Sequence, residues 1–249
     1  MNYPLNKGLI VRKIKDFPGL WYLYKIYTER KLRHRLNPKE QVAEKVFSGI
    51  YENNDWHNEE SLSGQGSALK HTNVIIEKLP AFLKKHGVKS MLDAPCGDFN
   101  WMRHVNLNDV QYTGGDIVAD LVKANQQRYG NEKISFIKID IIQDPLPKVD
   151  LIFVRDCLVH FNNANIELFV KNLMASDIQY LLTTNFPLTR NNYDISMGNF
   201  RFINLLRKPY NFPKELDILW EESTETYGQC PDKSLFLWRV EDLRKSRHA

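Results

Sequence analysis

The stretch Ser90-Met-Leu-Asp-Ala-Pro-Cys-Gly-Asp98 decides the fold. Its first half is a short apolar run typical of a buried strand, and its second half is a turn in which Gly97 permits a close backbone approach to a ligand. From this point on, short apolar runs alternate with helical stretches, which predicts βαβ units and a parallel sheet with helices on both faces. The predicted parallel strands are 90–94, 111–116, 134–140, 149–155 and 180–185.

Two further apolar runs, 216–220 and 234–240, are separated only by a polar loop that contains Gly228 and Pro231. They predict an antiparallel pair that closes the sheet. We therefore expect an α/β fold with a mostly parallel, seven-stranded, Rossmann-like sheet. Helices are predicted before the sheet, at about 38–47 and about 67–86, with a polar stretch between them.

The composition is that of an ordinary globular protein, because 43% of the 249 residues are hydrophobic and 26% are charged. This excludes collagenous, low-complexity and wholly disordered chains. The three cysteines lie far apart, which disfavours a metal or disulfide framework. No apolar run approaches the ~20 residues that span a bilayer, and no secretory signal is visible. We expect a cytoplasmic protein, with the inner face of the membrane as a second location.

The net charge of +4 is unevenly placed. Residues 1–45 carry 11 Lys/Arg and 4 Asp/Glu, a charge of +7, so that residues 46–249 carry −3. We therefore divide the chain into a basic, aromatic, helical extension at 1–45 and a catalytic domain at 46–249. Three roles are open for residues 1–35: packing on the body or on a second subunit as a dimer, contact with an anionic membrane, or contact with an anionic glycan or nucleic acid. Nucleic acid is the least supported partner.

In a parallel α/β sheet, ligands bind beyond the carboxyl ends of the strands. The first strand ends near Asp93 and Asp98, and two carboxylates without a GxGxxG pattern favour a cationic or amine-bearing ligand over a pyrophosphate. The second ends at Asp116, about 20 residues after the glycine turn, where an acid suits two ribose hydroxyls. After the third, Asp140 can accept from an adenine amino group and Ile141 can pack on the ring.

These three strand ends and the end of the fourth strand, at residues 150–161, together resemble the class I S-adenosylmethionine-dependent methyltransferases. The resemblance covers roughly 88–185 for the cofactor motifs and about 45–243 for the catalytic domain. It departs from the family at Pro95 and Asp98, which leave one glycine of the usual three. The resemblance implies that S-adenosylmethionine is the cofactor, with its methionine part on the 93–97 turn, its ribose on Asp116 and its adenine on Asp140 and Ile141. The predicted cofactor-binding residues are Ser67, Asp93, Ala94, Pro95, Cys96, Gly97, Trp101, Asp116, Ile117, Asp140, Ile141 and Arg155.

A narrower resemblance is to bacterial methyltransferases associated with surface-polysaccharide and capsule biosynthesis, through residues 61–67, 93–98 and 192–205. It implies O-methylation of a sugar, a nucleotide-sugar or a nascent surface glycan. Two alternatives remain open: a methyltransferase for RNA or a small phosphorylated metabolite, and an inactive scaffold subunit with the cofactor fold.

The fourth strand is followed by the candidate catalytic residues Asp156 and His160. His160 is the base best placed by its ordinary pKa, and its alternative role is a half-buried histidine bonded to a backbone carbonyl. Asp156 can orient His160 or bind an acceptor hydroxyl, and its alternative role is to cap the next helix. Arg155 can pair with an anionic acceptor or form a structural ion pair with Asp156 or Asp140.

The predicted acceptor-binding residues come from three places. Trp56 belongs to a glycine-containing stretch that can form a lid or a plain connection, Asn185 ends the fifth strand, and the loop 190–204 supplies Asn192, Asp194 and Arg201 or is simply solvated. Asp156 and Asn185 partly resemble the Mg²⁺ site of catechol-type O-methyltransferases, but Thr184 replaces its third ligand, so we expect no metal. The fourth strand lacks the Asp/Asn-Pro-Pro-aromatic motif of amino-group methyltransferases, which disfavours N-methylation of nucleic acid.

Overall fold

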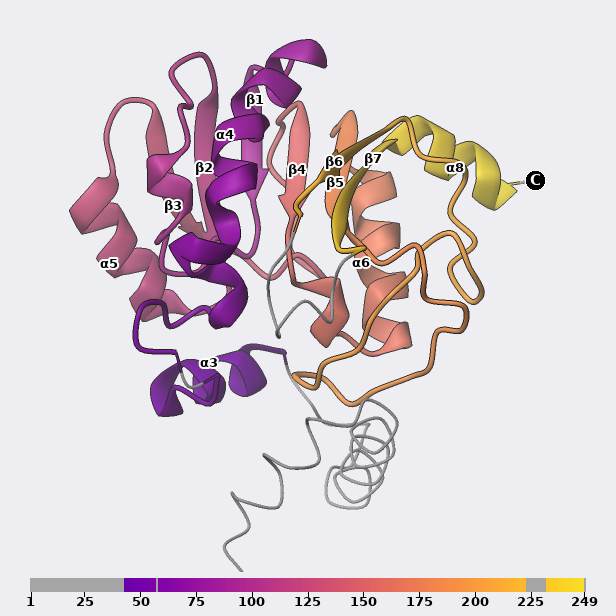
Figure 1. Cartoon of the computed structure of the whole chain (residues 1–249), viewed down its shortest axis with the longest axis horizontal. Helices are drawn as coiled ribbons and strands as arrows, with labels where there is room; N and C mark the ends of the chain where they lie inside the picture. Colours follow the sequence, from indigo (N-terminus) through magenta and orange to yellow (C-terminus); the bar gives the residue numbers. More distant parts are fainter. Residues whose placement is uncertain (1–42, 57, 223–231, 249) are drawn as a thin grey trace, which may run out of the picture. The chain divides into compact units, whose positions relative to one another are not determined.

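The computed structural model describes residues 43–56, 58–222 and 232–248, and the statements below concern these residues. Their centre is a seven-stranded sheet with the order β3-β2-β1-β4-β5-β7-β6 (Figure 1). The strands are β1 (Ser90–Asp93), β2 (Gln111–Asp116), β3 (Ile134–Lys138), β4 (Leu151–Val154), β5 (Tyr180–Asn185), β6 (Asp217–Trp220) and β7 (Ser234–Arg239).

Strands β1 to β5 pair in parallel, whereas β7 pairs antiparallel with both β5 and β6. The predicted mixed sheet with an antiparallel pair at its end is therefore confirmed, and the strand ends differ from prediction by at most two residues. The chain order reverses between β1 and β4, which places a crevice at the carboxyl ends of these two strands. Because β7 runs the opposite way, its first residues lie at this same edge, opposite Asn185.

Helices cover both faces of the sheet. On one face, α4 buries Ile75, Leu79 and Leu83 against the sheet, and on the other α6 buries Ile166, Phe169 and Val170. A cap formed by Asn162 starts α6, since its side chain accepts a hydrogen bond from Asn165 N at 2.8 Å. The helices are α3 (Ala43–Asn53), α4 (Leu69–Lys85), α5 (Ala119–Tyr129), α6 (Asn163–Ala175) and α8 (Val240–His248).

The two hydrophobic cores follow from the alternation of side chains along each strand. In β4, Ile152 and Val154 join the core under α6, whereas Leu151 and Phe153 join the core under α4. Strand β7 divides its side chains in the same way. A strand buried on both faces requires a continuous apolar run, which is why these strands could be recognised without polar alternation.

The predictions for the chain before the sheet have different outcomes. The predicted helix at 38–47 begins outside the described residues, and α3 continues beyond it to Asn53. The helix predicted at 67–86 is α4, preceded by a 3₁₀ turn at Gln65–Ser67. The basic segment 1–35 lies outside the described residues, so its role and the division at residue 45 stay predictions. Among the helices described, none combines the length and apolar character needed to cross a membrane.

Candidate functional site

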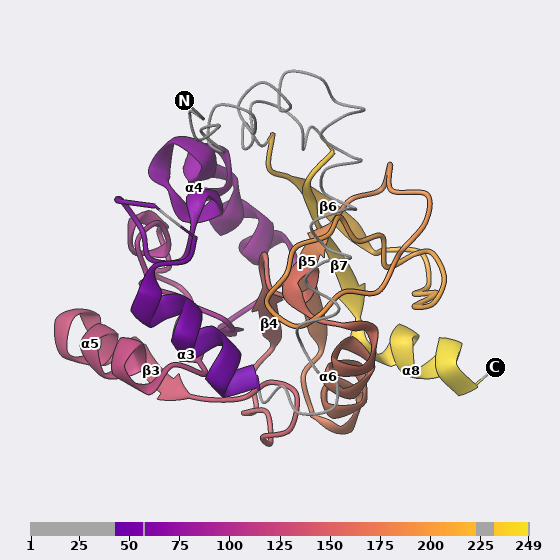
Figure 2. The same cartoon turned by 90° about the horizontal axis from the view of Figure 1, so that it is seen from below.

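A cavity of about 510 Å³ opens at the carboxyl edge of the sheet. This volume lies in the ordinary range of small-molecule and cofactor sites. Residues that follow β1, β2, β3 and β4 form its floor, and α3 together with the segment 61–67 lies over it. Figure 2, seen from below, shows α3 in front of this edge of the sheet.

The turn after β1 forms one wall of the cavity. Gly97 has a φ of +56°, a conformation that L side chains rarely adopt. A Cβ atom at this position would lie 2.0 Å from Ser63 Oγ. The glycine is therefore required twice, once for the backbone conformation and once for the close packing of the 61–63 segment against the turn.

Asp98, which departs from the glycine pattern of the resembling family, binds the same segment. Its carboxylate accepts hydrogen bonds from Ser61 Oγ at 3.0 Å, Leu62 N at 2.9 Å and Ser63 Oγ at 3.3 Å, and its own N–H donates to Ser63 Oγ at 3.0 Å. Its neighbour Asn100 donates to the Ser67 carbonyl at 3.1 Å. These hydrogen bonds thus hold the segment that the sequence suggested as a lid against the turn after β1.

Two buried carboxyl groups lie on the floor. Tyr112 donates its hydroxyl to Asp93 Oδ2 at 2.7 Å, and burial raises the pKa of Asp93 to about 7, although the Tyr112 hydrogen bond opposes this. Asp116 accepts from Gly97 N and Val118 N, both at 3.1 Å, while burial raises its pKa to about 6. Burial makes both groups costly to ionise, and a cationic ligand would lower that cost.

The residues after β3 form the third part of the floor. Asp140 accepts from Ile142 N at 2.9 Å and from Gln143 Nε2 at 3.0 Å, so its carboxylate also shapes the turn that carries Ile141. Burial raises the pKa of Asp140. Asp140 and Ile141 both line the cavity, as a planar ring bound at this position requires.

Arg155 links four parts of the site. Its guanidinium bonds twice to Glu221 Oε2, at 2.7 and 3.0 Å, donates to the Gly66 carbonyl at 2.9 Å and lies 3.2 Å from Asp156 Oδ2. It also lies over the Trp101 ring, 5.3 Å from the centroid. Of the two roles open for Arg155, the structure displays the ion pair with Asp156, and Arg155 lines the cavity as well.

Asp156 carries the most constrained carboxylate of the cavity. Its φ of +51° is unusual for a residue other than glycine, and its N–H donates to Thr184 Oγ1 at 2.8 Å. Lys233 Nζ lies 2.5 Å from Asp156 Oδ2. Burial opposes ionisation of Asp156, but the Lys233 ammonium and the Arg155 guanidinium outweigh it and lower the pKa of this carboxyl. The capping role does not occur, because the cap of α6 is Asn162.

His160 lies on a 3₁₀ turn at Leu158–His160, directly after this carboxylate. Its Nδ1 is 3.0 Å from the Asn199 carbonyl oxygen, which can only accept, so Nδ1 carries the proton and Nε2 has the free lone pair when the ring is neutral. Burial lowers the pKa of His160. The ring stands between Trp56 and Phe200, at centroid distances of 5.4 and 5.8 Å. The ring is thus oriented, and its neutral form carries the proton on Nδ1.

Aromatic side chains surround this end of the cavity. They come from α3, from the segment after it, from the turn after β4 and from the segments after β5 and before residue 201. Gly198 allows α3 to approach, since a Cβ there would lie 2.8 Å from Val46 Cγ1. The aromatic residues are Phe47, Tyr51, Trp56, Phe161, Phe186 and Phe200.

The structure brings most of the predicted site residues together. All the predicted cofactor-binding residues, both predicted catalytic residues and Trp56 line this one cavity. The remaining predicted acceptor-binding residues, Asn185, Asn192, Asp194 and Arg201, are not among its lining residues.

The four residues outside the cavity hold the chain after β5 in place. Asn185 accepts from Leu205 N at 2.7 Å, and Asn192 donates to the Asn204 carbonyl at 2.9 Å. Arg201 is fully buried, donates to the Phe161 carbonyl at 2.7 Å and forms an ion pair of 3.6 Å with the exposed Asp194. The loop 190–204 was expected to offer these polar groups to an acceptor, but internal hydrogen bonds use them instead.

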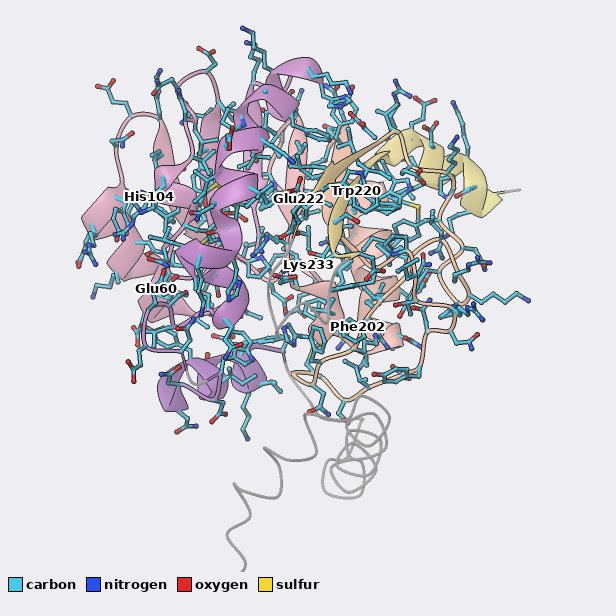
Figure 3. The ribbon with its side chains drawn as sticks, in the orientation of Figure 1. Glu60, His104, Phe202, Trp220, Glu222 and Lys233 are labelled. Atoms are coloured by element: carbon cyan, nitrogen blue, oxygen red, sulfur yellow. The ribbon has the colours of Figure 1, made fainter. Side chains whose placement is uncertain are left out.

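Sequence reasoning missed Lys233 and the aromatic face of α3. Lys233, labelled in Figure 3, precedes the last strand. It contacts Asp156 after β4 only because β7 is antiparallel. Phe47 and Tyr51 are four residues apart and share a helix face, so their spacing was a visible signal. Among the described residues, no three His, Cys, Asp or Glu side chains are grouped so that they could hold a metal ion.

Comparison with known proteins rests on structure, since no protein-family model and no curated protein sequence matches the chain. The 1,6-didemethyltoxoflavin-N1-methyltransferase of Burkholderia thailandensis, solved with 1,6-didemethyltoxoflavin and S-adenosylhomocysteine, matches with a TM-score of 0.57 and 14% identity over 82% of this chain and 90% of that one. Human N-acetylserotonin methyltransferase in complex with S-adenosylmethionine matches with a TM-score of 0.54 and 14% identity over 80% and 60%. PigF with S-adenosylhomocysteine matches with a TM-score of 0.55 and 14% identity over 78% and 62%.

The chain thus spans less than two thirds of the length of the last two proteins. At this level of identity the likeness concerns the fold, and the Rossmann-like methyltransferase fold expected from the sequence is confirmed.

Proposed function

We propose that this protein is an S-adenosylmethionine-dependent methyltransferase that transfers a methyl group to a hydroxyl, with His160 as the general base. The observation that carries this proposal is the cavity itself. Buried carboxyls at Asp93 and Asp116 occupy one end, and a neutral, oriented imidazole among aromatic rings occupies the other. The cofactor motifs and the base were predicted from separate parts of the sequence, yet they line one cavity.

The cofactor end suits a ligand with positive charge and two ribose hydroxyls. Gly97 leaves room for close backbone approach, Asp116 offers a carboxylate next to it, and the Asp140–Ile141 turn provides an acceptor and an apolar surface. When bound, S-adenosylmethionine supplies a methyl group already activated by the sulfonium charge. The chain therefore has to align the acceptor with that methyl group and to accept a proton.

At the acceptor end, His160 performs the proton step. Nε2 would accept the hydroxyl proton of an acceptor bound there, and S-adenosylmethionine, when bound, would supply the methyl group for the acceptor oxygen. The hydrogen bond from Nδ1 to the Asn199 carbonyl keeps Nε2 available for this role. Burial lowers the pKa of His160, so that the ring is neutral and ready to accept a proton at pH 7.

For the acceptor we propose a compact ring that bears the hydroxyl, and within this class a sugar, a nucleotide-sugar or a nascent surface glycan. Aromatic walls such as Trp56 and Phe200 support a ring-shaped ligand, because they can contact the apolar face of a sugar ring. The polar loop that first suggested a sugar gives no such support, since Asn192 and Arg201 lie outside the cavity.

Two measurements test the proposal. Calorimetry with S-adenosylhomocysteine should detect binding that Asp116→Ala weakens at least about tenfold, which is ~1.4 kcal/mol, and His160→Gln should leave it unchanged. Transfer of a radiolabelled methyl group to a panel of sugars, nucleotide-sugars and aromatic alcohols should proceed and should be lost in His160→Gln.

Absence of S-adenosylhomocysteine binding would refute the cofactor assignment. Binding without methyl transfer to any compound of the panel would favour the inactive scaffold. Transfer only to aromatic alcohols would retain the reaction and refute the sugar acceptor.

A further inference from the structure

The acceptor end of the cavity contains a lysine whose role neither the fold nor the proposed reaction explains. Lys233 precedes β7 (labelled in Figure 3), and its side chain is only 1% exposed. It lines the cavity together with Asp156 and His160. A lysine is almost never buried to this degree unless it is paired. Lys233 is paired, since its ammonium lies 2.5 Å from Asp156 Oδ2 and 3.7 Å from Glu221 Oε2.

The paired charges form a compact group. Arg155 and Lys233 supply two positive charges, and Asp156 and Glu221 supply two negative ones, all within 4 Å of a partner. Replacing a buried ion pair by apolar residues is often neutral or stabilising, so such a pair is weak evidence of a purely structural role. Arg155, Asp156 and Lys233 line the same cavity as His160, which points to a role in the reaction.

Asp156 is the member of this charged group that is nearest to His160 in the sequence. The Asp156 carboxylate is 26% exposed toward the cavity, and its backbone and side chain are both fixed by Thr184. Only three residues separate it from His160. A carboxylate favours the imidazolium that forms when His160 accepts a proton, whereas a lysine ammonium disfavours it. Both groups act electrostatically on the imidazole.

We propose that Lys233 is a positioning residue of the methyl-transfer site that acts together with its partner Asp156: the opposite charges of the two side chains, which line the cavity with His160, set how readily that imidazole takes up a proton. The proposal rests on the proposed function for its meaning, because His160 needs this adjustment only if it is the base.

The other elements packed on His160 present aromatic rings and a backbone carbonyl group. Trp56 and Phe200 present aromatic rings, and the turn at 198–200 presents the Asn199 carbonyl. Among the described residues, the charged side chains that line the cavity with His160 include Asp156 after β4 and Lys233 before β7. Arg155 contacts Asp156 and therefore acts through it.

The first test uses the cofactor-free protein and needs no acceptor. An NMR titration follows the His160 imidazole, identified by its absence in His160→Gln. In Lys233→Met the midpoint should rise by about 0.5 pH units or more, because the repelling ammonium is gone. In Asp156→Asn it should fall by a similar amount, because the attracting carboxylate is gone.

Two controls and one substitute variant separate the effect of the Lys233 charge from a general change of structure. Lys233→Arg keeps the charge and should titrate like the wild type. Lys78→Met removes a surface lysine from its 2.6 Å pair with Glu222 and should do the same. Lys233→Gln keeps a donor for Asp156 without the charge, so it replaces Lys233→Met if that variant does not fold.

Opposite shifts in the two variants would support the proposal, since a general loosening of the site would move both midpoints the same way. Unchanged midpoints, or shifts of the same sign, would overturn it.

The second test measures methyl transfer against pH. The acid limb of kcat/KM should move upward in Lys233→Met, with the greatest loss at low pH and recovery at high pH. An acid limb that stays in place while the NMR midpoint moves would overturn the catalytic meaning of the pair. If the wild-type protein transfers no methyl group, the proposed function fails on that result, and the NMR titration still decides whether the pair sets the protonation of His160.

Discussion

Asp98→Ala should release the segment that covers the cofactor end of the cavity. Asp98 is the residue that breaks the expected glycine pattern, and its carboxylate accepts three hydrogen bonds from the segment 61–63, at 2.9, 3.0 and 3.3 Å. If each bond to this partly exposed carboxylate contributes about 1 kcal/mol, the substitution removes about 3 kcal/mol from the closed state. The backbone N–H of residue 98 still donates to Ser63 Oγ, so the turn itself should persist.

This loss should appear as exchange of backbone amides. A change of about 3 kcal/mol corresponds to a factor of about 100 in an equilibrium, since about 1.4 kcal/mol is tenfold. Amide protection at 62–66 should therefore fall by up to about 100-fold, while protection in β4 stays unchanged. Affinity for S-adenosylhomocysteine should fall by at most the same factor, because binding requires the closed fraction of the protein.

The control is Asp109→Ala, a substitution of an exposed acid in the loop before β2. It removes the same charge without touching the covering segment, and neither exchange nor affinity should change. Equal protection at 62–66 in Asp98→Ala and in the wild type would refute the reasoning. An affinity loss without faster exchange would also count against it, because the effect would then come from direct contact with the ligand.

Three further outcomes follow from the buried floor. Burial raises the pKa of Asp93 to about 7 and that of Asp116 to about 6, so a cationic ligand should bind the protein in which both carboxyl groups are ionised. Calorimetry in two buffers should therefore show that ligand binding releases protons near pH 6.5. The affinity for the ligand should fall as the pH drops from 7.5 to 5.5. Tyr112→Phe removes a hydrogen bond that favours the Asp93 carboxylate, so the proton-release profile should move to higher pH. Gly114→Ala places a Cβ 2.5 Å from the Phe136 ring and should lower the free energy of unfolding by about 1–3 kcal/mol in urea titrations, whereas an unchanged value would contradict the packing.

The cofactor end could be predicted because its residues are local in sequence. Asp93 and Asp116 are the last residues of β1 and β2, Asp140 follows β3 closely, and the carboxyl ends of parallel strands must meet at one edge. Once the runs were identified as strands, the placement of the three acids followed from topology alone. No long-range contact had to be guessed.

The polar side chains of the loop 190–204 illustrate what the sequence could not show. Polar residues in a loop suggest solvent or a ligand, yet a long chain segment also has many backbone groups of its own to satisfy. Arg201 and Asn204 are buried and donate to carbonyl groups of Phe161, Pro187 and Thr189. The sequence shows the polar side chains but not the carbonyl groups that bind them.

The place of Lys233 in the site could not be predicted for a second reason, because it depends on the register of strand pairing and not on composition. Its neighbour Ser234 pairs with Asn185 on β5 and with Trp220 on β6. This antiparallel register brings Lys233 to the carboxyl ends of β4 and β5, and Glu221, one residue beyond β6, to the same place. A one-residue shift of β7 would turn its side chains to the opposite face of the sheet. The contacts of Glu221 with Arg155 and of Lys233 with Asp156 therefore depend on strand pairing, because the partners lie 66 and 77 residues apart in the chain.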